Sequence, residues 1–498
     1  MKSFRILFTV LMLAAGWSCG GAQPDPAPSP NPDPVPEPEP EKVEGAKGWI
    51  TSADKTCLFK ESDISFGKAA SMSPYLVNLD PSVKYQTIDG FGAAMTWASC
   101  YNLLKMDPED RAALLKDLFD PETGLGIGLI RVSIGASDFN YEEYTWCDKS
   151  GIENFAVDSR DRSTVFPILK EIYAINPDIN IIASPWSVPK WMKMKVNGTG
   201  TYDSWTSGRL NPDYYEAYAE YLVRWIEVME EEGFRIEAIT LQNEPLNHGN
   251  SMSTYMPWED QRDFIKKAMG KALAEAQLDT KILVFDHNYN YDNNSGQEQY
   301  PLHIYNDSEA SKYVAGSAWH NYGGSVTELK KIHEAAPDKE IYFTEASIGT
   351  WNYDFASCLV NDFKSIFLQT LEYYNKGVTL WNFVLDDKKG PYSPQSGSCK
   401  TCYGVVEVSS SDYKLTDRKT HYYNIAHASV AARPGAVRIG TSGYTANGIT
   451  YQAFSNPDGG YGVMILNETS SEQQLVFADS EHSVKISVPG KSIASLRW

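Results

Sequence analysis

Short apolar runs alternate with longer helical segments between about residues 86 and 430 of the chain. Each run is almost continuously apolar, which is typical of strands that are covered on both faces in a parallel sheet. Eight such runs occur, and we expect strands at Thr87–Ala93, Gly126–Ile134, Ile179–Ala183, Ile236–Leu241, Lys281–Phe285, Tyr313–Trp319, Glu340–Thr344 and Gly377–Phe383.

The segments between these runs have the spacing of amphipathic helices. The clearest is Asp213–Glu232, in which Tyr218, Leu222 and Trp225 recur at intervals of three or four residues and glutamates fall elsewhere on the helical wheel. Further helices are predicted at Pro108–Leu118, Ser163–Ile175, Pro257–Ala276, Val326–Ala335 and Phe355–Asn375. Eight strands alternating with helices predict an α/β fold, a (β/α)₈ TIM barrel. The alternation is also compatible with a doubly wound open sheet.

The pattern changes after about residue 430, where glycine, asparagine and proline separate short runs of Val, Ile and Tyr. These runs lack a helical period and predict an attached all-β sandwich domain. The earlier stretch Trp49–Lys84 is also strand-like, and we expect it to join the same sandwich. The expected organisation is a signal peptide at 1–18, a linker at 19–45, N-terminal sandwich strands at 46–85, the barrel at 86–430 and the C-terminal sandwich at 431–498.

The N-terminus has the features of an export signal. Lys2 and Arg5 precede the apolar run Ile6–Trp17, which is too short to span a bilayer. Small residues and then Cys19 follow, as in a bacterial lipoprotein signal, so we expect lipidation of Cys19. Ordinary secretory cleavage is the alternative.

A proline stands at every second position from Pro24 to Pro40. Because proline fixes φ and donates no backbone hydrogen bond, this stretch predicts an extended spacer. Anchor and spacer together predict an exported lipoprotein of a bacterial outer membrane or cell surface, which touches the membrane only through its lipid. A periplasmic location is the alternative.

The net charge of −20 opposes binding to nucleic acid, whose phosphates would be repelled. The 13 Trp and 30 Tyr residues suit sugar faces, because each ring offers an apolar plate with a polar edge. Seven cysteines are present, and the closest couple is Cys399 and Cys402. A loop disulfide or free thiols both fit this couple, whereas a zinc site would need a second close pair or histidines nearby.

Two glutamates follow predicted strands: Glu244 in LQNEP after the fourth and Glu345 in IYFTEAS after the seventh. In a barrel, functional residues lie at the carboxyl ends of strands, and strands four and seven face each other across the mouth. Paired carboxyl groups about 5–5.5 Å apart hydrolyse glycosides with retention of configuration. The structural alternative is that each glutamate caps the next helix, with Pro245 holding Glu244 in an extended conformation.

Polar and aromatic residues at other strand ends would suit a sugar subsite, which needs rings to stack and side chains that bond hydroxyl pairs. Each one alone also fits a packing or ion-pair role. The residues are Arg131, Asp138, Trp186, His320, Tyr322, Trp381 and Asn382.

The motifs GFGAAMT, RVSIGASDF, ASPWSVPKWMK, QNEP and TEAS together resemble glycoside hydrolase family 30, the glucosylceramidase and β-1,6-glucanase group. The resemblance covers roughly residues 49–498. It implies that Glu345 is the nucleophile and Glu244 the acid/base. It also implies that Asn243 bonds the sugar 2-hydroxyl, that Asp138, Trp186 and Trp381 line the −1 subsite, that Arg131 supports Glu345 and Asp138, and that Tyr322 forms a hydrogen bond near the nucleophile. From its position after the sixth strand, we expect His320 to lie near the two glutamates and to bind substrate. No metal or cofactor is implied.

We therefore expect a monomeric, retaining endo-β-1,6-glucanase that acts on β-glucan. A glucosylceramidase is the nearest alternative, and a non-catalytic glycan-binding lipoprotein is an alternative of another class. Trp97 replaces an acidic residue found in many relatives (GFGAAMTWAS against GFGGAFTEAS). We therefore expect the rim of the active site at this position to bind a different substrate. We expect the leaving-group subsites in the long loops Asn288–Ile304 and Asp386–Tyr403.

Overall fold

The computed structural model describes residues 45–68 and 72–498. The predicted signal peptide, the lipidation site Cys19 and the proline-rich spacer lie outside the described residues. Within the described part of the chain, no helix is both long and apolar enough to cross a membrane.

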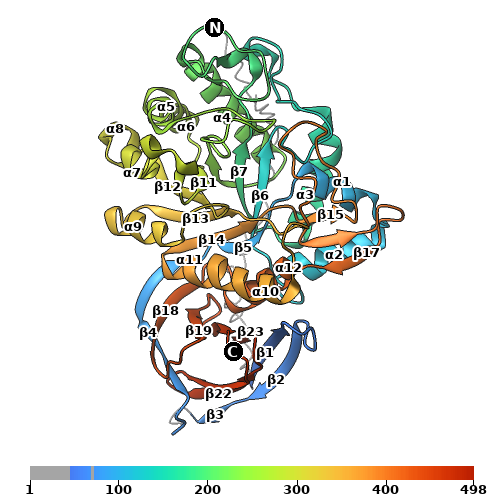
Figure 1. Cartoon of the computed structure of the whole chain (residues 1–498), viewed down its shortest axis with the longest axis vertical. Coiled ribbons are helices and arrows are strands. Elements are labelled where there is room, and N and C mark those ends of the chain that lie inside the picture. The colour runs from blue at the N-terminus through green and yellow to red at the C-terminus, as the bar shows by residue number, and fades with distance from the viewer. Residues whose placement is uncertain (1–44, 69–71) are drawn as a thin grey trace, which may run out of the picture. The chain divides into compact units, whose positions relative to one another are not determined.

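Eight parallel strands form the centre of the molecule (Figure 1). They are β5 (Gly90–Ala93), β6 (Leu129–Ile134), β7 (Asn180–Pro185), β10 (Ile236–Thr240), β11 (Lys281–Asn288), β12 (Val314–His320), β13 (Glu340–Glu345) and β14 (Asn375–Leu380). Their spatial order follows the chain order, with β14 beside β5, and a parallel bridge between Ala94 and Arg131 links β5 to β6. The TIM barrel is confirmed, and the doubly wound sheet is excluded because the strand order closes on itself.

Close packing at the seam between β5 and β6 requires glycine. A Cβ atom on Gly92 would lie 1.9 Å from the carbonyl oxygen of Leu129.

The predicted second strand, 126–134, was too long at its start, since the observed strand begins at Leu129. The predicted fifth strand, 281–285, was too short, since β11 continues to Asn288.

Helices surround the barrel at the places where the amphipathic segments predicted them. Helix α4 (Tyr215–Glu231) follows a short turn in which the side chain of Asn211 accepts a hydrogen bond from the amide of Asp213. It buries Tyr218, Leu222 and Trp225. The predicted helix at 257–276 contains a π-helical turn, Ile265–Met269, and the predicted helix at 355–375 contains another, Phe363–Leu368.

The remaining helices are α1 (Trp97–Lys105), α2 (Pro108–Phe119), α3 (Ser159–Ile175), α5 (Trp258–Phe264), α6 (Gly270–Ala276), α7 (Tyr300–Tyr305), α8 (Ser308–Ser311), α9 (Thr327–Ala335), α10 (Phe355–Asp362), α11 (Gln369–Glu372) and α12 (Thr420–Ala431). The single-turn 3₁₀ segments are Ile152–Asn154, Lys190–Met192, Pro212–Tyr214, Tyr291–Asn293 and Ser295–Gln297. Two small sheets add β8 (Lys193–Met194) with β9 (Arg209–Leu210), and β15 (Val384–Asp386) with β16 (Val406–Val408) and β17 (Leu415–Arg418).

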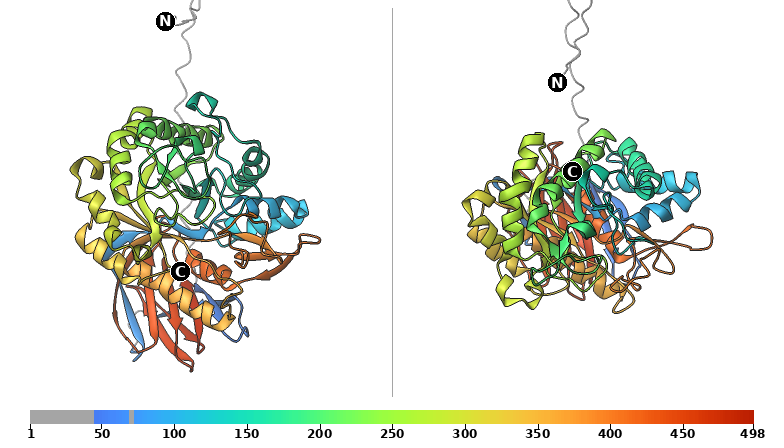
Figure 2. Two further views of the ribbon diagram at one scale, coloured as in Figure 1. Left: turned by 45° about the horizontal axis from the view of Figure 1, so that its top comes forward. Right: turned by 90° about the horizontal axis from the view of Figure 1, so that it is seen from above.

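A second sheet system unites strands from both ends of the chain (Figure 2). From the N-terminal part come β1 (Gly45–Ser52), β2 (Lys60–Ser65), β3 (Gly67–Lys68) and β4 (Leu76–Thr87). From the C-terminal part come β18 (Val437–Gly443), β19 (Ile449–Ser455), β20 (Tyr461–Asn467), β21 (Gln473–Ala478), β22 (His482–Val488) and β23 (Ser492–Arg497). Strand β1 pairs with β23, and β4 pairs with β18 and β21. The β-sandwich predicted beside the barrel is therefore present, and its N-terminal strands are part of it.

Cys399 and Cys402 form a disulfide, so the first of the two interpretations of this couple is correct. Among the described residues, Cys57, Cys100, Cys147 and Cys358 are free thiols.

Candidate active site

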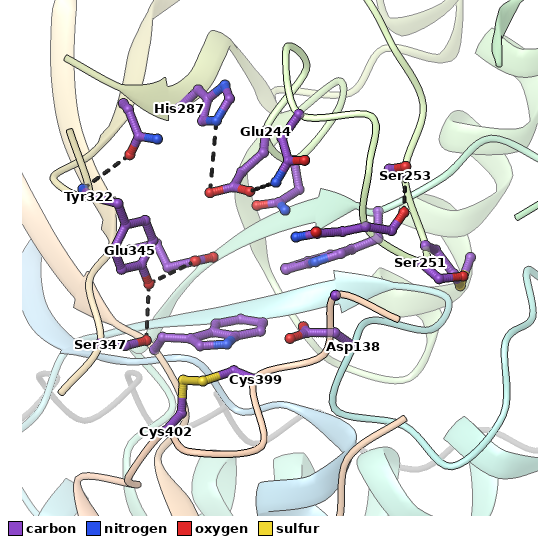
Figure 3. A pocket seen from close by; sticks show the side chains of 18 of the residues that line it. Asp138, Glu244, Ser251, Ser253, His287, Tyr322, Glu345, Ser347, Cys399 and Cys402 are labelled. Carbon is purple, nitrogen blue, oxygen red and sulfur yellow. Dashed lines mark hydrogen bonds and ion pairs between the residues drawn. A yellow bond between two sulfur atoms is a disulfide. The ribbon is translucent and has the colours of Figure 1, made fainter. Parts of the chain in front are cut away.

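A cavity of about 360 Å³ opens among the loops that follow the barrel strands (Figure 3). The predicted site residues that line it are Asp138, Trp186, Asn243, Glu244, Tyr322, Glu345 and Trp381. Arg131 and His320 are fully buried and contact the lining carboxylates. The structure therefore brings the predicted substrate-contact residues to one site, with the exception of Asn382.

Glu345 is the last residue of β13, and its side chain is fixed by two donors. Its Oε2 accepts a hydrogen bond from Arg131 Nη1 at 2.7 Å, and its Oε1 accepts one from the Tyr322 hydroxyl at 3.0 Å. Helix α10, which follows, is capped by Asp354. Glu345 is therefore not a helix cap.

Glu244 lies in a turn after β10, and its backbone has a φ of +46°. The expectation of an extended backbone before Pro245 was therefore wrong. The turn is held by two hydrogen bonds: the amide of Glu244 donates to the carbonyl of Asp286, and the amide of Asn247 donates to the carbonyl of Glu244. The helix-cap interpretation also fails here, since α5 begins only at Trp258, after Pro257.

The side chain of Glu244 faces Glu345 across the cavity. One carboxylate oxygen of each glutamate and one ring nitrogen of His320 lie within 4.8 Å of one another. Glu244 Oε2 accepts a hydrogen bond from Asn247 Nδ2 at 2.8 Å, and Oε1 lies 3.3 Å from His320 Nδ1. This separation suits the two-carboxylate chemistry of a retaining glycosidase.

Asp286, in β11, is a site residue that the sequence analysis missed. Arg131 pairs with Glu345 and Asp286, so the expectation that it also supports Asp138 was wrong. Its carboxylate is fully buried and lies 2.8 Å from Arg131 Nη2 and 3.1 Å from His320 Nε2. It also accepts hydrogen bonds from the hydroxyls of Thr240 and Thr344, at 2.7 and 2.6 Å. Asp286 thereby connects the guanidinium that orients Glu345 with the imidazole that contacts Glu244.

His287, the next residue, was also missed. It lines the cavity, and its Nε2 lies 3.9 Å from Glu244 Oε1 (Figure 3). Both residues follow Phe285, where the apolar run that predicted strand five stops. The signal that could have found them is the sequence FDHN, in which an acidic residue and a histidine follow a strand of the barrel directly.

The buried charges perturb one another strongly. Burial would raise the pKa of Asp286, but the guanidinium of Arg131 and the imidazole of His320 hold it well below its usual range. Burial alone would lower the pKa of His320, but the carboxylates of Glu345, Asp286 and Glu244 raise it to about 9. His320 therefore carries a proton at neutral pH, between two carboxylates.

The two glutamates shift in opposite directions. Burial opposes ionisation of Glu244, yet the imidazoles of His287 and His320 lower its pKa to about 2. Burial raises the pKa of Glu345, and the charge of Glu244 adds to this effect, although His320 and Arg131 oppose it. At neutral pH Glu244 is therefore ionised in the free site, and the neighbouring proton is on His320.

Aromatic rings and a neutral carboxyl group form another part of the cavity wall. The rings of Trp186 and Trp381 stack with centroids 5.1 Å apart, and the Arg131 guanidinium lies 4.9 Å from the Trp186 ring. Burial, together with the charge of Glu345, raises the pKa of Asp138 to about 8. At neutral pH Asp138 therefore holds a proton that it can donate to a hydroxyl group.

Asn243 lies between these groups. Its Oδ1 accepts a hydrogen bond from Arg131 Nη2 at 2.8 Å, which leaves its amide nitrogen as a donor for a ligand. Asn382 instead accepts a hydrogen bond from the hydroxyl of Thr96, and it is absent from the cavity lining. Trp97 is buried against Tyr101 and Tyr141 at a separate cavity, so it does not contribute to the rim of this one.

Two long loops contribute to the cavity as the sequence predicted. The first supplies Asn288 and Asp292, and the second supplies Gly397, Cys399 and Cys402. The loops after β10 and β13 add lining residues that were not predicted, and these are Asn247, Asn250, Ser251, Met252, Ser253, Ser347 and Trp351.

Glu244, His320 and Glu345 also have the composition of a metal-ligand cluster. However, Glu345 already binds Arg131, and both ring nitrogens of His320 face carboxylates. A cation placed among them would lie close to the guanidinium and to the protonated imidazole. The charges of the site therefore favour a sugar over a metal ion.

Comparisons with known proteins agree with this geometry. The model described as the glycosyl hydrolase family 30 TIM-barrel domain matches residues 88–430, and that of the family's beta sandwich domain matches residues 435–496. The solved structure of the endo-beta1,6-glucanase BT3312 is 49% identical, covers 91% of this chain and 99% of its own, and superposes with a TM-score of 0.89.

Curated relatives are more distant. An endo-1,6-beta-D-glucanase of Neurospora crassa is 31% identical over 432 residues, which are 83% of this chain and 86% of that protein. The lysosomal acid glucosylceramidase of Mus musculus is 27% identical over 446 residues, which are 85% of this chain and 83% of that protein.

Proposed function

Because this chain belongs to glycosyl hydrolase family 30, we propose that it is a retaining endo-β-1,6-glucanase with Glu345 as nucleophile and Glu244 as acid/base. The observation that carries the assignment is the pair of carboxylates within 4.8 Å at the ends of β10 and β13. The stacked Trp186 and Trp381 beside this pair offer apolar faces for a glucosyl ring.

In the first step, Glu345 attacks the anomeric carbon and Glu244 protonates the departing oxygen. Arg131 and Tyr322 aim the two oxygens of Glu345 and stabilise its charge until the glycosyl ester forms. The hydrogen bonds of Glu345 to Arg131 and Tyr322 carry the assignment of the nucleophile, since a permanent cation favours the ionised carboxylate.

Glu244 must donate a proton to the leaving oxygen in the first step and accept one from water in the second. In the free site this proton is held on His320, whose Nδ1 lies 3.3 Å from Glu244 Oε1. His320 can therefore supply the proton that Glu244 passes to the leaving oxygen. In the second step the ionised Glu244 removes a proton from the water that hydrolyses the ester, and its low pKa favours this basic role.

A sugar leaving group is favoured over a ceramide. The cavity lining beyond the carboxylates includes Asn247, Asn250, Ser251, Ser253 and Asp292, which can bond hydroxyl groups. Acyl chains would need a largely apolar surface instead. The higher identity to the endo-beta1,6-glucanase BT3312, 49% against 27% for the mouse glucosylceramidase, supports the same choice.

Product analysis on linear β-1,6-glucan, with glucosylceramide in parallel, tests this function. We expect β-1,6-linked oligosaccharides from the glucan and no comparable release of glucose from the lipid. Glucose from the lipid with the glucan intact would replace the proposal by a glucosylceramidase. Binding of glucan without any product would favour the non-catalytic alternative, and Glu345→Gln supplies the inactive reference.

We further propose that the protein is a monomer exported as a lipoprotein through Cys19. The support for export and lipidation is the sequence of the first 40 residues, with its basic start, short apolar run and alternating prolines. Labelled palmitate should be incorporated by the full chain in a bacterial host and not by Cys19→Ala. Equal labelling of both chains would contradict the anchor, and a dimer mass in size-exclusion chromatography with light scattering would contradict the monomer.

A further inference from the structure

Trp351 is an exposed aromatic side chain at the mouth of the catalytic cavity. It lies in the loop that follows β13, and it lines the same cavity as Glu244 and Glu345 while 51% of its surface is exposed. A single exposed aromatic residue is ordinary on a protein surface. The role of Trp351 is instead inferred from the contacts that hold its ring in place.

One edge of the indole packs directly on the backbone. A Cβ atom on Gly349 would lie 1.9 Å from Trp351 Cζ3 and 2.4 Å from Cη2, so only glycine leaves room for the ring at this distance. Part of the indole is thereby fixed against the protein, and its exposed part remains available to a ligand. A ring that is already immobilised loses little side-chain entropy when it binds.

The loop that carries the ring is fixed to the disulfide loop. Gly349 forms an antiparallel bridge with Cys402, and the amide of Thr350 donates to the carbonyl of Thr401 at 2.9 Å. The Cys399–Cys402 disulfide closes that loop, and both cysteines line the cavity. The position of Trp351 is therefore set by bonds on both sides of Gly349.

The order of the strands places Trp351 across the barrel from Trp186. Asp138 follows β6 and Trp186 follows β7, whereas Trp351 follows β13. In the ring of eight strands, β7 and β13 are four positions apart and thus opposite each other. Glu244, which protonates the leaving oxygen, lines the same cavity as Trp351, so a leaving-group sugar beside Glu244 would lie at the exposed mouth that includes Trp351.

We propose that Trp351 is the stacking platform for the leaving-group glucosyl unit of the substrate, an inference that rests on the proposed glucanase function. The apolar face of the pyranose would lie on the exposed part of the indole. Asn247, Asn250 and Asp292, which line the same cavity, offer polar atoms to the hydroxyl groups of that sugar. Trp351 is thus a specificity residue that distinguishes a sugar leaving group from a small one.

Two substrates separate this role from a general effect on the enzyme. Linear β-1,6-gluco-oligosaccharides present a leaving-group sugar, whereas β-glucosyl fluoride places only fluoride on that side. For Trp351→Ala we expect kcat/KM on the oligosaccharides to fall roughly tenfold, since aromatic stacking contributes up to about 1.5 kcal/mol. The fall with glucosyl fluoride should be much smaller, and Trp351→Phe should recover part of the loss on the oligosaccharides.

Tyr141→Ala is the matched control. Tyr141 is equally exposed, at 52%, but lines a separate cavity, so its removal should leave both substrates unaffected. If Trp351→Ala lost equal activity on oligosaccharides and on glucosyl fluoride, or lost none on either, the role of Trp351 as a stacking platform would be refuted. The proposed glucanase function would not be affected by that result. A wild-type enzyme that cleaves glucosyl fluoride but no β-1,6-linked oligosaccharide would overturn the proposed function as well.

Discussion

Arg131 is the group whose removal should cost the most, because three buried partners depend on it. Its guanidinium lies 2.7 Å from Glu345, 2.8 Å from Asp286 and 2.8 Å from Asn243. The side chains of Arg131 and Asp286 are fully buried, and that of Glu345 is 8% exposed. Substitution by methionine would keep much of the volume but leave two carboxylates without their cation.

Removing one partner of a buried ion pair destabilises a protein by about 3–5 kcal/mol, since the charge left behind has no compensation. We expect Arg131→Met to lower the free energy of unfolding by this amount at pH 7. The double variant Arg131→Met/Asp286→Asn should recover part of the loss, because the stranded charge is then absent. The free energy of unfolding of Arg131→Lys should lie between those of wild type and Arg131→Met, since an ammonium keeps the charge but not the planar fork of donors.

Urea unfolding at several pH values measures these differences. The folded-state pKa of Asp286 is depressed, so the carboxylate contributes stability above its ordinary pKa of 3.8 and loses this contribution as the pH falls. The gap between wild type and Arg131→Met should therefore narrow below pH 3.8. A gap that stays constant down to low pH, or a double variant no more stable than the single one, would refute this reasoning.

Three further predictions concern the carboxyl groups and His320. Glu244→Gln should slow glucan hydrolysis by roughly 10²–10⁴-fold, but it should slow formation of the glycosyl-enzyme from glucosyl fluoride less, because a fluoride leaving group needs little protonation. Equal slowing of both substrates in stopped-flow measurements of that step would contradict the acid role of Glu244. His320→Gln should change the pH dependence of stability: the raised pKa of His320 means that its contribution is complete below 6.5 and lost as the pH rises through about 9, so the variant should lack this decline in urea titrations. Asp138→Asn should retain more glucan activity at neutral pH than Asp138→Ala, because Asp138 is held neutral and asparagine still donates a hydrogen bond; identical kcat/KM values for the two variants would contradict that role.

Much of the architecture followed from periodicity alone. The eight apolar runs were all strands, and the position of Glu244 and Glu345 after the fourth and seventh of them placed both at the cavity. The strand pairing of the sandwich could not be predicted, since β1 pairs with β23, which is almost the whole chain away in sequence. The sequence showed only that these segments resemble strands.

The parts that could not be predicted depend on tertiary contacts. Asp286 and His287 were hidden because β11 continues beyond its apolar run, with Asp286 buried by an ion pair rather than by apolar character. The positive φ of Glu244 goes with a hydrogen bond to Asp286 in β11 and another within its own turn to Asn247, which outweigh the local preference before proline. The role of Gly349 beneath Trp351 likewise depends on a close approach that no local pattern records.

The central claim is that Glu345 forms a covalent bond to the sugar. The most direct measurement is mass spectrometry of proteolytic peptides after reaction with a 2-deoxy-2-fluoro-β-glucoside carrying a good leaving group. The account predicts a fluoroglucosyl ester on Glu345 in wild type and no such ester in Glu345→Gln. A label on Glu244 or on another residue, or full turnover of the reagent without any labelled peptide and with inversion at the anomeric carbon, would contradict it.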